Sequence, residues 1–307
     1  MEKDSKILII AQSNMIKSAL FNHLSTAGFT NVGMSESLMP GEKPDYIFLT
    51  EWVGGILANI KYPAELMYNL TTLELNVIHG ACKAGVKKLL FLARSCIYPK
   101  DCPQPMSEKH LLTGELDPST EPSAIATILG IKMCQYYNKQ YGTNYVVAVP
   151  TGVYGPNDDF DLETAHVLPA LIRRFHEAKI ASSPSVTLWG SGNPKREWLY
   201  IDDLADALVF LTENYDSSEM INIGVGEDVS IKEMARLIAQ ICGFKGDILF
   251  DTSKPDGMQK KLLDNSKLKG LGWEPKISLP EGINRTYNWF CTEGTLGVAS
   301  INNRDTI

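Results

Sequence analysis

Short apolar runs alternate along the first half of the chain with longer segments whose apolar positions recur every three or four residues. The runs at 6–11, 45–50, 87–92 and 145–149 predict parallel strands that are buried on both faces. The segments at 15–27, 64–84 and 123–141 predict the helices that connect them. This order predicts a doubly wound, Rossmann-like α/β sheet.

The regular alternation ends after Gly155-Pro156. A helix at 167–177, a strand at 186–189 and a helix at 230–242 follow, so we expect a smaller α+β substrate domain beside the sheet. The predicted boundaries are 1–160 plus about 198–228 for the Rossmann-like domain, about 161–197 and 229–293 for the smaller domain, and 294–307 for a mobile tail.

Composition narrows the class of protein. The 307 residues are 44% hydrophobic and 21% charged, with a net charge of -7 and no long basic run, which argues against a nucleic-acid or membrane-surface partner. No apolar run is long enough to span a bilayer. The six cysteines lack metal-ligand spacing, so we expect reduced thiols, no metal and a cytoplasmic location.

The turn after the first strand departs from the dinucleotide-binding pattern. Glycines there let the backbone approach a pyrophosphate, but Ala11-Gln12-Ser13-Asn14 and the following Met15 contain none. The stretch 35–44 is also too short and proline-rich for the helix that a full nucleotide half-site needs. The sequence therefore predicts a degenerate NADP site and no cofactor.

Four ordered motifs resemble those of the GDP-L-fucose synthase family, within the extended short-chain dehydrogenases/reductases. They are Ser95-Cys96-Ile97-Tyr98-Pro99, Tyr154-Gly155-Pro156, the run 189–197 and Lys254-Pro255-Asp256-Gly257. The likeness runs from Gly54 to Trp289. It implies an enzyme of the kind that epimerises GDP-4-keto-6-deoxymannose at C3 and C5 and reduces its 4-keto group.

The reductase residues of that family do not carry over. Its Ser, Tyr and Lys match Arg94, Ser123 and Thr127 here. An aliphatic hydroxyl cannot replace a phenol whose pKa is lowered by an ammonium group. Together with the glycine-free turn, this predicts that the 4-reductase activity is lost.

The epimerase residues do carry over, as Cys96 and His166. The ordinary pKa values of a thiol and an imidazole, about 8.5 and 6.5, lie on either side of neutrality, so one can act as an acid and the other as a base. Arg94 could stabilise the enolate that forms, or it could fill the space of a nicotinamide and pair with an acid.

The resemblance also implies a GDP-sugar site and a homodimer. The matching positions for the nucleotide are Val167, Leu171, Arg174, Trp189, Arg196 and Lys261. Two guanidinium groups and an ammonium suit a diphosphate. The helices at 64–84 and 123–141 are apolar over much of their circumference, as burial against both a sheet and a second subunit requires.

These inferences give one function and two alternatives. We expect a cofactor-independent epimerase that acts at C3, C5 or both of a GDP-4-keto sugar, a hexose or a heptose, and passes its product to a separate reductase. The first alternative is a catalytically inactive GDP-sugar-binding protein that acts as a regulatory or scaffolding subunit. The second is a working reductase with an unusual proton donor.

Overall fold

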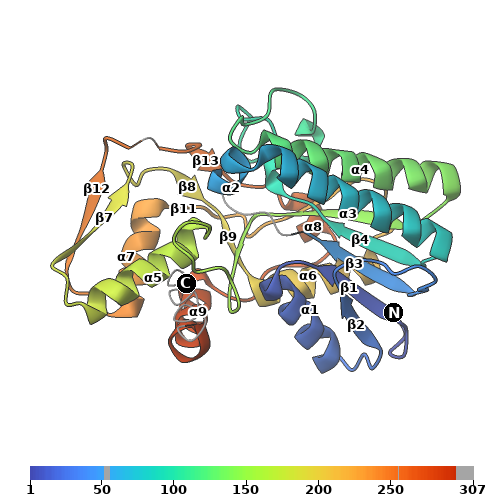
Figure 1. Ribbon diagram of the computed structural model, residues 1–307, viewed down its shortest axis with the longest axis horizontal. Helices are drawn as coiled ribbons and strands as arrows, with labels where there is room; N and C mark the ends of the chain where they lie inside the picture. The colour runs from blue at the N-terminus through green and yellow to red at the C-terminus, as the bar shows by residue number, and fades with distance from the viewer. Residues whose placement is uncertain (52–55, 255, 295–307) are drawn as a thin grey trace, which may run out of the picture.

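A parallel sheet of six strands forms the centre of the computed structural model, which describes residues 1–51, 56–254 and 256–294. The strand order is β10-β5-β4-β3-β1-β2 (Figure 1). The strands are β1 (Ile7–Ala11), β2 (Val32–Ser35), β3 (Tyr46–Thr50), β4 (Lys88–Leu92), β5 (Tyr145–Pro150) and β10 (Ile221–Ile223). The chain reverses its direction across the sheet between β1 and β3, where ligands bind in folds of this kind.

Alternate side chains of each strand enter two different cores. Ile7 and Ile9 of β1 belong to a cluster with α1 (Asn14–Thr26) and α6 (Ile201–Asn214). Leu8 and Ile10 belong to a second cluster with α3 (Pro63–Ala84) and α4 (Glu121–Tyr141). Because successive side chains of a strand point to opposite faces, the two helix pairs cover the two faces of the sheet.

A second group of elements lies at the other end of the molecule in Figure 1. Its helices are α5 (Val167–Ile180), α7 (Ile231–Cys242) and α9 (Leu279–Trp289). Strand β7 (Ser185–Trp189) pairs with β12 (Asp247–Asp251), and β8 (Lys195–Arg196) lies between β11 (Val229–Ser230) and β13 (Lys260–Lys261). The remaining elements are α2 (Ile56–Lys61), α8 (Ser266–Gly270), β6 (Gly152–Tyr154) and β9 (Trp198–Tyr200).

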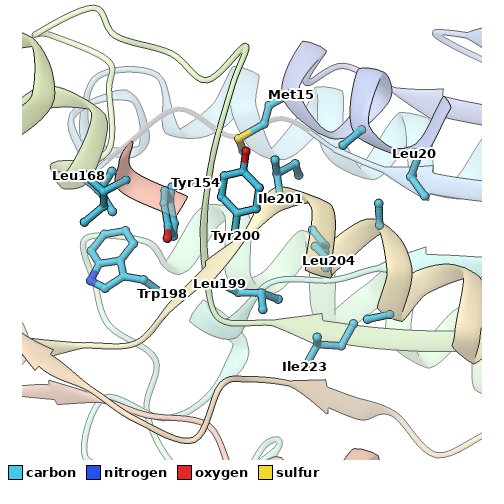
Figure 2. Packing of buried hydrophobic residues seen from close by; sticks show 14 of the residues in the cluster. Met15, Leu20, Tyr154, Leu168, Trp198, Leu199, Tyr200, Ile201, Leu204 and Ile223 are labelled. Atoms are coloured by element: carbon cyan, nitrogen blue, oxygen red, sulfur yellow. The ribbon is translucent and has the colours of Figure 1, made fainter. Parts of the chain in front are cut away.

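Packed aromatic rings join the two groups of elements (Figure 2). The ring centroid of Tyr154 lies 6.4 Å from that of Trp198 and 5.7 Å from that of Tyr200, both edge to face, a favourable arrangement for aromatic pairs. All three side chains are buried, and they share one core with Met15 and Leu168. This core fixes the start of α1 relative to the start of α5.

The predicted fold class is confirmed. Each strand and helix predicted from the sequence forms within a few residues of its expected bounds, and residues 36–45 contain no helix. The domain boundaries stay predictions, and the predicted tail lies outside the described residues from 295 onward. Within the described ranges, no helix is long and apolar enough to cross a membrane, and no group of three metal-ligating side chains occurs.

Candidate functional site

A cleft of about 950 Å³ opens at the carboxyl ends of the parallel strands. Its walls come from the β1–α1 turn, from the segments that follow β3, β4 and β5, and from the start of α5. The two-residue strands β8 and β13 close its far end. Segments far apart in sequence therefore contribute side chains to a single site.

Cys96 enters the cleft from the turn that directly follows β4. Ser95–Ile97 form one turn of 3-10 helix, and the Cys96 side chain is half-buried. Tyr98 anchors this turn, because its hydroxyl donates a hydrogen bond of 2.5 Å to Asn222 Oδ1 on β10. The thiol is thus held in place by the sheet.

His166 lines the same cleft, at the N-cap position of α5. Solvent in the cleft reaches its side chain, and the surrounding protein still reduces the hydration of the imidazole. Burial lowers the pKa of His166, the charge of Asp159 raises it, and that of Lys261 lowers it. Because burial disfavours the charged imidazolium, His166 is neutral at physiological pH.

Lys261 lines the same cleft as Cys96 and His166. Burial lowers the pKa of Lys261, and a thiolate at Cys96 would raise it. Lys261 is also the register partner of Arg196 across the β13–β8 pair, which places two cations side by side on one wall. A pair of cations in this position suits a diphosphate.

The structure gathers most of the predicted site residues but not all of them. Cys96, His166, Arg94, Val167, Trp189, Arg196 and Lys261 line the cleft. Leu171 is buried in the core, and Arg174 is exposed on α5; neither lines the cleft. The roles of all these residues stay predictions.

Arg94 lies against the face of α4 where the resemblance places the tyrosine and the lysine of the reductase. Its Nη2 donates to Thr127 Oγ1 at 2.5 Å and to the Ser123 carbonyl at 3.2 Å. The Ser123 hydroxyl donates to the Thr120 carbonyl, and the Thr127 hydroxyl donates to the Ser123 carbonyl. Both hydroxyls are therefore engaged within α4.

The β1–α1 turn forms the other end of the cleft. Gln12, Ser13 and Asn14 line it, and Ser13 caps α1 by accepting from the Ile16 amide at 3.5 Å. The first amides of a helix have no carbonyl of their own to bond, and they attract phosphate. The backbone of this turn therefore fits a dinucleotide phosphate, although it lacks glycine.

Among the acidic residues of the cleft wall that the sequence did not indicate as site residues, Glu51 and Asp158 are notable for their burial. Glu51 follows β3, and Asp158 lies in the loop after β6. The Asp158 Oδ2 atom is buried and receives no hydrogen bond within the described part of the chain, and burial raises the pKa of Asp158 to about 7. No motif marks either residue; only the strand ends that precede them could have drawn attention to them.

The family model, the similar sequences and the similar structures all indicate the same family. The model of the NAD dependent epimerase/dehydratase family matches residues 4–224. The chain is 47% identical to GDP-L-fucose synthase 1 of Arabidopsis thaliana, with 94% of each chain covered, and 48% identical to the Escherichia coli GDP-L-fucose synthase, with 81% of each covered. A GDP-D-glycero-L-gluco-heptose synthase from Campylobacter jejuni, solved in the presence of NADPH, superimposes with a TM-score of 0.88 at 33% identity, covering 95% of this chain and all of the other.

These comparisons correct two expectations from the sequence. The predicted loss of the 4-reductase and of the cofactor is wrong, because relatives at 47–48% identity are GDP-L-fucose synthases and a solved relative was crystallised with NADPH. The physical reason is that helix amides, rather than particular side chains, meet the phosphates. A separate reductase was expected only because the 4-reductase activity was predicted to be lost, and this expectation no longer has a basis.

Fold, cleft and comparisons agree. The chain belongs to the NAD dependent epimerase/dehydratase family, among the extended short-chain dehydrogenases/reductases that resemble GDP-L-fucose synthase.

Proposed function

We propose that this protein is a GDP-sugar enzyme of the epimerase/reductase kind, and that it acts on a GDP-4-keto-6-deoxyhexose or a related GDP-4-keto sugar. The observation that carries the proposal is the meeting of Cys96, His166 and Lys261 in one cleft that also reaches the β1–α1 turn. The names of the relatives supply the substrate class.

Cys96 and His166 form the proton-transfer pair of this proposal. A carbon next to a ketone carries an acidic hydrogen, because the charge left by its removal is shared with the ketone oxygen. Neutral His166 takes this proton from one face of the ring, and the Cys96 thiol returns a proton to the other face. One C–H bond breaks and one forms, so the proton count balances once the pair re-equilibrates with water.

The enolate oxygen formed in this step needs a hydrogen-bond donor or a positive charge nearby. Arg94 lines the same cleft as Cys96 and carries a guanidinium charge. A preorganised group of this kind at a developing oxyanion contributes about 3 kcal/mol to the stability of the transition state. Arg94 therefore serves as the electrostatic stabiliser of the enolate.

The remaining wall residues hold the nucleotide. Arg196 and Lys261 bind the diphosphate, and Trp189, whose side chain is 70% exposed, offers a flat surface to the base or the ribose. At the other end of the cleft, the β1–α1 turn and the N-terminus of α1 hold the phosphates of NADP(H). When bound, the dinucleotide would supply the hydride for the 4-keto carbon, and a proton from water would complete the alcohol.

Ring-proton NMR of the GDP-4-keto sugar in deuterium oxide tests this function. With protein alone, deuterium should enter at C3 or C5; with NADPH added, absorbance at the nicotinamide band should fall as the ketone is reduced. Absence of ring exchange, with a known GDP-L-fucose synthase active in parallel, would contradict the proposal. A GDP-sugar that raises the melting temperature without exchange would instead indicate a regulatory or scaffolding protein.

A matched pair of cysteine variants isolates the thiol. Cys96→Ser should lower the exchange rate by about 10²-fold or more, because it removes the acid of the pair. Cys291→Ser changes an exposed thiol outside the cleft and should leave the rate unchanged. Equal rates in the two variants would remove Cys96 from the mechanism.

The finer proposal for the assembly is a homodimer formed through α3 and α4. Large apolar side chains are exposed along the outer face of these neighbouring helices: Met67, Tyr68, Leu75, Ile125, Leu129 and Tyr136. Contiguous apolar surface of this kind is typical of an interface. A second copy of the chain would pair the patch with itself around a twofold axis.

A further inference from the structure

Three ionisable side chains meet at the cleft wall. Glu51 follows β3, Glu74 lies in α3, and Arg94 follows β4. Glu51 Oε2 lies 3.3 Å from Arg94 Nη1, and the Glu51 side chain is 1% exposed. Glu74 is fully buried. Glu51 and Arg94 both line the cleft, and Arg94 is the more open of the two, with a side chain that is 20% exposed.

The two carboxyl groups are close enough to share one proton. Within the described residues, none of their four oxygens receives a hydrogen bond of good geometry, unless a proton lies between the two groups. Burial and the neighbouring charge of Glu51 raise the pKa of Glu74 well above its ordinary value, and burial also raises the pKa of Glu51, which the charge of Arg94 lowers. One proton on the pair satisfies both carboxyls, because two adjacent buried carboxylates cannot both ionise.

Helix α4 leaves space for this pair. A Cβ atom at Gly130 would lie 2.8 Å from Glu74 Oε2 and 2.8 Å from the Phe91 ring, both too close. The missing side chain at position 130 therefore lets the Glu74 carboxyl lie against the helix backbone. With one proton on the pair, the two acids and Arg94 carry no net charge, which limits the cost of burying them.

Arg94 is held from two sides. The carboxylate of Glu51 lies at Nη1, while Thr127 Oγ1 and the Ser123 carbonyl accept hydrogen bonds from Nη2. A long side chain normally loses rotamer freedom when it binds a ligand. Here that freedom is already lost before the substrate arrives, as electrostatic preorganisation requires.

We propose that Glu51 is a positioning residue for Arg94: with the protonated Glu74 behind it, Glu51 holds the guanidinium at the cleft wall, where its positive charge stabilises the ketone oxygen of the substrate as negative charge develops there. This inference rests on the proposed function. If Glu51 had a purely structural role, its substitution would change the stability of the fold and leave kcat of the folded enzyme unchanged.

A double-mutant cycle on the proton-exchange reaction tests this role. Glu51→Gln should lower kcat for deuterium incorporation by about 10-fold and change KM by less than about 2-fold, because the substrate still binds to Arg196 and Lys261. In the Arg94→Gln background, Glu51→Gln should have no further effect on kcat. Equal losses in both backgrounds, or no loss in either, would overturn the proposal.

Substitutions of Glu74 provide the rescue comparison. Glu74→Gln keeps a hydrogen-bond donor toward Glu51 and should retain most of the rate, whereas Glu74→Leu has the same bulk without the donor and should lose about 10-fold. Equal rates in these two variants would also contradict the proposal. Glu65→Gln, on the exposed first turn of α3, controls for loss of an acidic residue.

Two measurements keep the outcomes separate. Circular dichroism and thermal unfolding of each variant identify loss of folding. If Glu51→Gln unfolds, the double variant Glu51→Gln/Arg94→Gln, which leaves no unpaired charge, replaces it. Its kcat is compared with that of Arg94→Gln and with that of Glu51→Gln/Arg94→Lys. In that comparison, recovery of kcat by Lys at position 94 without Glu51 would overturn the proposal. Absence of exchange in the wild type would instead refute the proposed function, whereas wild-type exchange that is insensitive to Glu51 would refute only this inference.

Discussion

At the scale of single residues, the cleft sets the protonation state of a side chain that solvent can reach. His166 is exposed at the N-terminus of α5, yet burial lowers its pKa, and the Lys261 ammonium lowers it further against the opposing charge of Asp159. A neutral imidazole is therefore the resting state of His166 in the proposed pair. This state can accept a proton without first losing one.

The first prediction concerns the pH dependence of proton exchange. The rate should fall as the pH drops through the pKa of His166, because the imidazolium cannot accept a proton. Since that pKa lies below the ordinary value of about 6.5, the acid limb of kcat should lie below pH 6.5 or so. A series of rates between about pH 5 and pH 8, with His166→Asn as the control, measures it; an acid limb above the ordinary value would contradict the assignment.

The second prediction concerns stability and belongs to Glu74. Its pKa is raised on folding, so between the ordinary value of 4.5 and the raised value the Glu74 carboxyl binds more protons in the folded protein than in the unfolded chain. The contribution of this group to stability is then highest below pH 4.5 and falls as the pH rises towards the folded pKa, by at most about 1.4 kcal/mol per pH unit. The charged and titratable groups that act on Glu74 or feel its charge are Glu51, Arg94 and Cys134, and burial keeps Cys134 a thiol.

Because glutamine cannot ionise, Glu74→Gln should remove that slope. Its free energy of unfolding in urea should exceed that of the wild type by a margin that grows from about pH 5 to pH 8. The same series on Glu65→Gln, an exposed change on α3, supplies the baseline. Wild-type and Glu74→Gln curves that run parallel would show that Glu74 does not hold its proton in the folded state.

At the scale of elements, periodicity predicted the central sheet because its strands are buried on both faces and its helices are long. The family resemblance also assigned Cys96 and His166 to one site, and both line the same cleft. The two- and three-residue strands β6, β8, β9, β11 and β13 carry no such pattern, because their pairing depends on residues distant in sequence. The Glu51–Glu74–Arg94 cluster was hidden for the same reason: its members lie on three separate elements.

The third prediction tests how closely α4 packs against α3. Gly130→Ala would place a methyl group 2.8 Å from Glu74 Oε2 and from Phe91, so we expect a loss of about 1–3 kcal/mol in the free energy of unfolding. Gly270→Ala in α8 meets no atom within 4 Å and should be neutral or slightly stabilising. Chemical denaturation measures both. An equal effect of the two substitutions would mean that α3 and α4 leave enough space for a methyl group at position 130.

At the scale of the whole molecule, the similarity of the entire chain outweighs local departures from a motif. The glycine-free turn and the pair Ser123 and Thr127 led the sequence reasoning to a lost cofactor, yet relatives covering most of the chain at 47–48% identity are GDP-L-fucose synthases. A glycine motif is one way to bring a backbone close to phosphate, and a helix N-terminus at a strand end is another. The cleft keeps that second feature at α1.

The outer face of α3 and α4 gives the last prediction. If it joins two copies of the chain, light scattering after size exclusion should give twice the mass of the 307-residue chain. Leu129→Glu, at a position that is 40% exposed on α4, should shift the protein to a monomer, because like charges would meet across the twofold axis. Leu249→Glu on β12, 49% exposed, introduces the same charge elsewhere and should stay dimeric. A wild-type monomer at micromolar concentration would refute the interface, and a Leu129→Glu variant that stays dimeric would place it outside this face of α3 and α4.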